Sequence, residues 1–443
     1  MTEKPASRIG LRRFAKTRCG VPTRVAACFL TAMALFVFPE MSAGYSVQTH
    51  EQLIDLTWKS SIQPFLLKRY STLTDGQLRE AHAYAYGGSA IQDLGYYPFG
   101  NAFFSDLTHY VRSGDFVRAL LNDAKTPDEL AFAVGALSHY VGDTAGHSEA
   151  VNPSVAIEFP KLGKEYGPSV TYAEGKHQHV RTEFAFDVNE LSKHRFAPAA
   201  YLKSVGLSIS VRLMAQAFEE TYGLKLHEVL GKRGSAVERG YRFSVRRFLP
   251  KIAYAETVLH RNDFPADAPS ADLARLEAEL KQADFDNGWE KFRKKAGVGT
   301  YLLAGAIVVV PKVGVLSDLS LKGPTDDTEE RYVASVLRST DALRKDLQND
   351  AMTAEILPNR DLDTGAKVKP GGHSLTDVTY AQLLTEVTRL RAVPAGLKED
   401  ILEYYADPSA PIVTKKDPAK WARVQADLER LRTMPVGVLS ASD

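Results

Sequence analysis

The sequence predicts a mainly α-helical protein, with a multi-helix core and an additional helical region at its C-terminal end. Two observations on pattern support this fold class: apolar residues recur at helical spacing in several long segments, and few stretches alternate with a period of two. The composition is a third, because 44% hydrophobic and 25% charged residues in a chain of 443 is typical of a globular protein. This length suits one large domain or two smaller ones.

Residues 1–44 have the features of a signal peptide rather than of a folded element. A basic stretch from Arg8 to Arg24 precedes an apolar run over 25–38, and the small residues Ser42, Ala43 and Gly44 follow. The apolar run is shorter than the ~20 residues that span a bilayer, so a retained membrane anchor is the less favoured alternative. We therefore expect cleavage after Gly44 and export to the periplasm or the medium.

Charge and cysteine content limit the chemistry of the mature chain. Both cysteines, Cys19 and Cys28, lie in the leader, which leaves no thiolate nucleophile, disulfide or Cys-ligated metal. The leader also holds seven of the 55 basic and two of the 54 acidic residues, so the remainder carries a net charge near −4. Such a chain has no overall basic field, and no specific nucleic acid partner is expected. The oligomeric state is left open.

Periodicity and capping signals predict the helices one by one. The segment 126–142 begins with residues suited to a helix start and is apolar nearly all round, which indicates a helix in the middle of a core. Residues 87–101 contain Gly and Pro and cannot form regular helix throughout. Helices are predicted over 52–67, 126–142, 176–190, 199–222, 238–259, 273–295, 376–390 and 418–432.

The chain changes character near residue 296, which predicts a domain over 45–295 and a helical region over 296–443 with no assigned role. An apolar segment over 301–316 is interrupted by Pro311 and Lys312, and it is too short and broken for a transmembrane helix. We interpret it as a buried helix or hairpin, with an element at a lipid interface as the alternative.

Histidines gather in one part of the chain, since eight of the 11 lie between His50 and His194. His139, Asp143 and His147 follow one another at a spacing of four and therefore share one face of a helix. Because this helix is otherwise apolar, the buried imidazoles and carboxylate need compensation. Either a metal ion or a simple His–Asp hydrogen bond would supply it.

Two more pairs have the same spacing. His179 and Glu183 would place a nitrogen and a carboxylate on adjacent helical turns, as chelation requires. His373 and Asp377 form the other pair, which we interpret as a solvated helix end away from any site. His50, Asp93 and His109 are further candidates, although each alone is also consistent with a hydrogen-bonded structural residue.

These residues, in this order, resemble the zinc-dependent phospholipase C superfamily. The stretch from Ala136 to His147, ALSHYVGDTAGH, is close to the most recognisable helix of that family. The superfamily includes fungal single-strand-specific nucleases and, more distantly, a phospholipase D that acts on glycolipid anchors. The resemblance covers residues 45–225, so the domain over 45–295 is expected to be the catalytic one, and nothing after about residue 300 takes part.

The resemblance implies an α-helical core that holds two or three zinc ions. Asp143 would be the bridging carboxylate, and Asp93 would be both a ligand and a group that orients or deprotonates water, so these two are the candidate catalytic residues. Where family members begin the mature chain with Trp, this one would begin with Tyr45, whose α-amine and carbonyl would bind metal. The implied ligands are Tyr45, His50, Asp93, His109, His139, Asp143, His147, His179 and Glu183.

The expected function is that of an exported, zinc-dependent phosphoric diester hydrolase, phospholipase C-like, acting on lipid head groups. The substrate would be a phospholipid or another phosphodiester, with peripheral contact to a membrane. Two alternatives stay open. One is a phosphodiesterase for nucleotides or single-stranded nucleic acid, and the other is a non-catalytic exported metal-binding protein.

Overall fold

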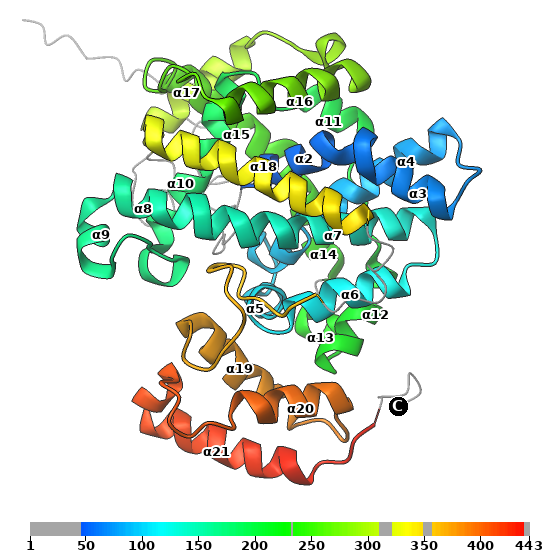
Figure 1. The fold of residues 1–443 in the computed structure, drawn as a ribbon, viewed down its shortest axis with the longest axis vertical. Coiled ribbons are helices and arrows are strands. Elements are labelled where there is room, and N and C mark those ends of the chain that lie inside the picture. The colour runs from blue at the N-terminus through cyan, green and yellow to red at the C-terminus, as the bar shows by residue number, and fades with distance from the viewer. Residues whose placement is uncertain (1–45, 232–233, 310–320, 349–356, 438–443) are drawn as a thin grey trace, which may run out of the picture. The chain divides into compact units, whose positions relative to one another are not determined.

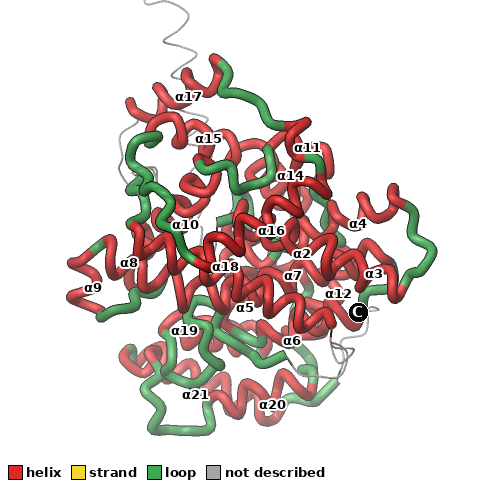
Figure 2. The backbone as a smooth tube through the Cα atoms, turned by 45° about the horizontal axis from the view of Figure 1, so that its top comes forward, coloured by secondary structure: helices red, strands yellow, loops and turns green. Residues whose placement is uncertain are grey.

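The computed structural model describes residues 46–231, 234–309, 321–348 and 357–437. The predicted signal peptide and Tyr45 lie outside these ranges. The described residues contain helices and loops but no β-strand, and only two isolated bridges join Arg360 to Lys367 and Val393 to Val436 (Figure 2). The prediction of a mainly α-helical fold is therefore confirmed.

The α-helices are α2 (Val47–Thr57), α3 (Gln63–Arg69), α4 (Asp75–Gly88), α5 (Ala102–Tyr110), α6 (Ser113–Asp123), α7 (Pro127–Ala145), α8 (Asn152–Glu158), α9 (Pro160–Tyr166), α10 (Tyr172–Ser192), α11 (Ala199–Val205), α12 (Val211–Tyr222), α13 (Leu226–Val229), α14 (Gly234–Phe243), α15 (Leu249–Leu259), α16 (Ala271–Asn287), α17 (Val298–Val309), α18 (Asp326–Gln348), α19 (Ser374–Val387), α20 (Ala395–Tyr404) and α21 (Pro418–Thr433). Short π-helical segments are η1 (Trp58–Ile62), η3 (Gly146–Val151) and η5 (Ser244–Phe248), and 3₁₀ turns are η2 (Gln92–Tyr96), η6 (Trp289–Phe292) and η9 (Val413–Lys416).

Helix α7 lies in the middle of the core, as its apolar sequence predicts. The hydroxyl of Thr126 caps its first turn, and helices α2, α4, α6 and α18 pack around it (Figure 1). Glycines bring α4 and α7 close together, because a Cβ at Gly135 would lie 2.2 Å from the carbonyl oxygen of Ala85. A Cβ at Gly88 would lie 2.0 Å from the carbonyl oxygen of Phe132. This contact fixes α7, which carries two of the candidate ligands near its C-terminal end, with a third, His147, just beyond it.

Several predicted helices correspond to observed ones, and others do not. Helices α7, α10, α16, α19 and α21 agree with the predictions in outline. The single helix predicted over 199–222 is wrong, because α11 ends at Val205 and Gly206 follows with a φ of +97°. Helices α4, α5, α6 and α18 are present without having been predicted.

Helix α17 forms in the apolar segment after residue 296, but the interpretation of that segment as buried is wrong over the residues described. Leu302 is 71% exposed and Val309 is 76% exposed, whereas Ala304 and Ile307 are buried against the protein. Residues 310–320 of the segment lie outside the described ranges. Among the helices that are described, none combines the length and the apolar character needed to cross a bilayer.

The region beyond residue 296 also contributes to the core. Helix α18 packs along α7 and against α2 and η3, and it runs beside α7 in both ribbon and tube views (Figures 1 and 2). Part of this region therefore lies directly against the helices that carry the candidate site. The domain boundary near residue 296 stays a prediction.

Candidate metal centre

Eight candidate side chains come together from six elements of the fold. Their distribution is as follows: α2 carries His50, η2 carries Asp93, α5 carries His109, α7 carries His139 and Asp143, η3 carries His147, and α10 carries His179 and Glu183. All eight are buried. The structure therefore brings together every described residue of the implied ligand set, while Tyr45 lies outside the described residues.

The end of α7 widens into a π-helical turn at η3, where His147 lies. A π-helical turn adds a residue to the helical repeat and re-aims the side chains that follow it, and such turns are frequent at functional sites. His139 and Asp143 remain one regular turn apart, while the carboxylate of Glu183 on α10 faces His147. The local geometry thus directs the residues of two helices toward each other.

Asp143 lies at the centre of one group of imidazoles. Its Oδ1 is 3.2 Å from Nε2 of His50, and its Oδ2 is 3.0 Å from Nε2 of His139 and 3.4 Å from Nε2 of His109. The rings of His50 and His139 stack with their centroids 4.2 Å apart. One fully buried carboxylate therefore faces three imidazole nitrogens.

Asp93 and the pair on α10 extend the cluster on either side. Oδ1 of Asp93 lies 3.3 Å from Nε2 of His109. On the other side, Oε1 of Glu183 lies 2.8 Å from Nε2 of His179 and 3.6 Å from Nε2 of His147. The donor atoms fall into three groups, each within 4.8 Å: His50, His139 and Asp143; Asp93, His109 and His139; and His147, His179 and Glu183.

Backbone carbonyls fix the tautomer of three of these histidines. Nδ1 of His109 lies 2.7 Å from the carbonyl oxygen of Ser105, and Nδ1 of His139 lies 3.0 Å from that of Ser89. Nδ1 of His147 lies 2.7 Å from the carbonyl oxygen of Leu362. Because a carbonyl only accepts, each Nδ1 must donate, which leaves Nε2 of the neutral ring as a lone pair directed into the cluster.

The centre is consequently rich in acceptors and poor in donors. The Nε2 atoms of His109 and His139 face each other at 3.3 Å, although neither carries a proton in this tautomer. Both oxygens of Asp93 and of Asp143 are buried without a hydrogen bond from any residue that the structure describes. Imidazole nitrogens and carboxylates at these positions fit metal ions, which would satisfy lone pairs that otherwise repel one another.

The protonation equilibria show the same demand for positive charge. Burial opposes ionisation of Asp143, but His139 and the other imidazoles beside it hold the pKa of its carboxyl well below the usual range. Burial likewise opposes a charged His109, yet Asp143 and Asp93 raise its pKa to about 10. Burial also raises the pKa of Glu183 well above its ordinary value and lowers that of His179. Either protons or metal ions must balance the carboxylates here.

The pair His373 and Asp377 corrects one interpretation from the sequence. His373 is not at a solvated helix end, because its side chain is only 8% exposed and lies between Asp361 and Asp363. Asp363 in turn lies 3.6 Å from Nδ1 of His147. Asp377 does stay away from the cluster, where it accepts hydrogen bonds from Gly371 and Tyr404.

Sequence reasoning therefore missed a group of residues beside the centre: Leu362, Asp363 and His373. The clue in the sequence was the third histidine pair, but the partners of His373 are Asp361 and Asp363 rather than Asp377. No regular spacing connects these two aspartates to a histidine ten or more residues further on.

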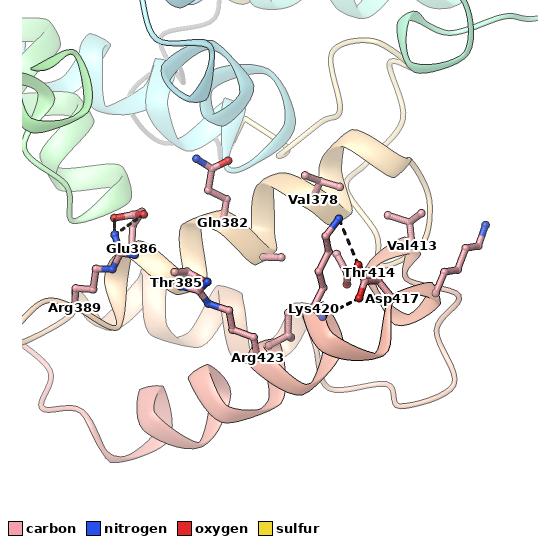
Figure 3. Close-up of a pocket in the computed structure, with 13 residues that line it drawn as sticks. Val378, Gln382, Thr385, Glu386, Arg389, Val413, Thr414, Asp417, Lys420 and Arg423 are labelled. Carbon is pink, nitrogen blue, oxygen red and sulfur yellow. Dashed lines mark hydrogen bonds and ion pairs between the residues drawn. The ribbon is translucent and has the colours of Figure 1, made fainter.

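A cavity of about 600 Å³ lies elsewhere, between α19 and α21. Figure 3 shows polar and charged side chains around it, including Gln382, Thr385, Arg389, Lys420 and Arg423. Glu386 and Arg389 pair at 2.7 Å, and Asp417 and Lys420 pair at 3.7 Å. None of its lining residues belongs to the histidine cluster, so we do not assign it to the same site.

Comparison with known proteins gives one match. Residues 49–231 match the family model described as zinc dependent phospholipase C. The matched range contains the eight buried side chains of the cluster. No curated protein and no solved structure is detectably similar to the chain.

Proposed function

Residues 49–231 belong to the zinc-dependent phospholipase C family, and on this premise we propose that the protein is a zinc-dependent hydrolase that cleaves the phosphodiester of phospholipids in the manner of a phospholipase C. The observation that carries the proposal is the position of Asp143, a buried carboxylate that faces the Nε2 atoms of His50, His109 and His139. The three groups of donor atoms would suit up to three ions. The eight side chains are proposed as their ligands.

Each part of the centre has a chemical role in this proposal. Zinc ions bound here would polarise phosphoryl oxygens and make water a nucleophile near neutral pH. Asp143 would balance the charge of two neighbouring cations. Asp93 has two buried oxygens without hydrogen bonds from described residues, so one of them is available to accept a proton from the attacking water.

The proposed hydrolysis needs no covalent intermediate between the enzyme and the substrate. The oxygen of water forms a bond to phosphorus, and the bond between phosphorus and the glycerol oxygen breaks. The proton that leaves the water ends on the glycerol oxygen, with Asp93 as the proposed carrier. The products are diacylglycerol and a phosphorylated head group, and no side-chain nucleophile is required.

Helix α17 supports the proposal that the protein contacts a membrane peripherally. Five of its large apolar side chains are more than half exposed: Val298, Tyr301, Leu302, Val308 and Val309. Exposed Lys294 and Lys295 precede the helix, which gives an apolar face beside positive charge, as an anionic lipid surface would favour. The helix packs on α15, and α15 packs on α10, which carries His179 and Glu183.

Export is part of the same proposal. The basic, apolar and small-residue segments of residues 1–44 support a cleaved signal peptide. An external location would bring the protein to the lipids of a membrane surface. Identification of the N-terminal residue of the protein recovered outside the cytoplasm would test this part by itself.

The central experiment measures hydrolysis and metal content together. The purified chain that begins at Tyr45 is loaded with zinc and given phosphatidylcholine vesicles and, in parallel, a nucleotide diester. We expect phosphorylated head group and diacylglycerol from the vesicles, and loss of most activity and of bound zinc in D143N. The exposed His227 offers a matched control, because H227Q should retain both. Hydrolysis of the nucleotide diester alone would contradict the proposal of a lipid substrate. Zinc binding without hydrolysis of either substrate would contradict the proposal that the protein is an enzyme.

A further inference from the structure

A segment far from the family-matched part of the chain lies directly on the centre. We call residues 357–373 the strap, since they contain no helix and connect the described part after α18 to α19. The hydroxyl of Tyr140 on α7 donates to the carbonyl of Pro358 at 2.6 Å, and the backbone N–H of Leu362 donates to the carbonyl of His109 at 3.0 Å. The strap is therefore attached to two helices that carry candidate ligands.

The close approach of the strap to α7 depends on Gly365. This residue has a φ of +68°, and a Cβ added to it would lie 2.5 Å from the carbonyl oxygen of Thr144, next to Asp143. Both the backbone conformation and the space thus require glycine. Glycine at position 365 therefore allows the strap to lie against the C-terminal end of α7.

The strap determines the orientation of His147. The ring of His147 donates from Nδ1 to the carbonyl of Leu362, which leaves Nε2 directed toward Glu183. His109 and His139 obtain the same kind of support from Ser105 and Ser89, inside the family-matched range. His147 obtains it from a residue 215 positions later in the chain.

Buried ion pairs and hydrogen bonds of Asp361, Asp363 and His373 stabilise the conformation of the strap. The carboxylate of Asp363 accepts the backbone N–H of Tyr172, at the start of α10, with distances of 3.1 and 3.3 Å to its two oxygens. His373 lies between two aspartates, with Nδ1 2.8 Å from Asp361 and Nε2 3.4 Å from Asp363. Since two buried carboxylates this near in sequence repel each other, the imidazole between them stabilises the conformation of the strap.

We propose that the strap completes the metal centre, with Leu362 and Asp363 as positioning groups for His147 and His373 as the residue that holds them. This inference rests on the proposed metal centre. The inference assigns a role to residues 357–373. These residues lie outside the family-matched range and contain none of the ligands expected from the sequence. The strap does not contact substrate in this proposal. It acts by keeping the Nε2 lone pair of His147 aimed at the group formed with His179 and Glu183.

The test measures metal affinity rather than activity. Zinc dissociation constants of the full-length mature chain are compared by competition with a chromogenic chelator for the unchanged protein, D363N, H373Q and G365A. Groups that hydrogen-bond to a metal ligand and so orient it typically contribute about 10- to 100-fold to metal affinity. We expect the affinity for the weakest-bound zinc ion to fall by about 10- to 100-fold in D363N and G365A, and by less in H373Q. K369A, an exposed position on the same strap, should bind zinc as the unchanged protein does.

A second measurement separates positioning from folding. Cobalt(II) in place of zinc reports the ligand geometry by its visible spectrum, and circular dichroism of the metal-free variants reports the fold. A changed cobalt spectrum in variants that keep their helical content supports the proposal. Unchanged zinc affinity and an unchanged cobalt spectrum in all three variants would overturn it, even if the variants melted at lower temperature. A failure of the unchanged protein to bind zinc would be a different result, because it would reject the proposed metal centre itself.

Discussion

Thr49 binds Asp187 through both its backbone and its side chain, with its N–H 3.2 Å and its hydroxyl 2.7 Å from Oδ1 of the carboxylate. The backbone N–H of Gln48 donates to the other oxygen of Asp187 at 3.1 Å. Asp187 lies on α10 one turn after Glu183. The start of the described chain is thus attached to the helix that carries two candidate ligands, immediately beside His50.

This attachment makes the position of Tyr45 testable. In a mature chain that begins at Tyr45, the α-amine lies five residues before His50 in the sequence, and a deprotonated amine is a usable ligand. We predict that protein beginning at Tyr45 holds one zinc ion more, or holds it more tightly, than protein beginning at Ser42. The measurement is zinc per chain after dialysis, combined with N-terminal sequencing of the exported protein. Equal zinc content and equal activity of the two proteins would refute the role of the amine, while leaving the eight side chains unaffected.

Removal of metal should destabilise the fold. Without metal ions, only bound protons can balance the buried carboxylates of Asp93 and Asp143, and the Nε2 atoms of His109 and His139 still lie 3.3 Å apart beside them. A ligand that binds only the folded chain contributes about 4 kcal/mol when it is present at 1,000 times its dissociation constant. We expect the melting temperature to fall by several degrees in EDTA and to recover with zinc but not with magnesium. In D143N the chelator should have a much smaller effect, and equal melting temperatures of the zinc-loaded and chelated unchanged protein would contradict the prediction.

The sequence was informative about the cluster because its central residues are local pairs. His139 with Asp143, and His179 with Glu183, are one helical turn apart, and the order of the remaining candidates resembles one family. Binding of metal by these side chains stays a prediction, but their convergence could be anticipated. The helix α7 could be predicted for the same reason, since apolar periodicity and its cap at Thr126 are both local signals.

The strap and α17 could not be predicted in this way, for two physical reasons. The contact between His147 and Leu362 uses a backbone carbonyl, which leaves no trace in residue types, and it joins positions 215 residues apart. In α17, hydropathy indicates that the helix is apolar but cannot indicate whether another helix covers it. Leu302 and Val309 were therefore expected to be buried, whereas both are exposed.

The exposed face of α17 predicts binding to lipid vesicles. Each large apolar side chain that moves from water into lipid contributes about 1.5–3 kcal/mol, and each nearby lysine contributes about 1 kcal/mol at an anionic surface. We expect the protein to sediment with vesicles of phosphatidylcholine and phosphatidylglycerol. The double variant L302K/V308K should bind about tenfold more weakly, because the loss of two apolar side chains outweighs the attraction of two added lysines to the anionic surface.

The control for this experiment is V378K, which introduces the same side chain at a half-exposed position on α19. It should bind vesicles as the unchanged protein does. Hydrolysis of a short-chain, water-soluble phospholipid should be equal in all three proteins, because α17 is not part of the centre. Full vesicle binding by L302K/V308K would refute the membrane role of α17 without affecting the proposed chemistry.

The pH dependence of stability should reveal the charge on His373. Burial alone lowers its pKa, but Asp361 and then Asp363 and Glu174 outweigh burial and raise it to about 9, from an ordinary value of 6.5. A group whose pKa is higher in the folded than in the unfolded state stabilises the fold fully at pH values below the unfolded pKa. This contribution, at most about 3 kcal/mol for such a shift, is lost as the pH rises from 6.5 through 9. We therefore expect the free energy of unfolding of the metal-free protein to exceed that of H373Q at pH 6 and to approach it at pH 9.5. Urea titrations of both proteins at several pH values measure the difference, and a difference that stays constant from pH 6 to 9.5 would show that His373 is neutral between the two aspartates.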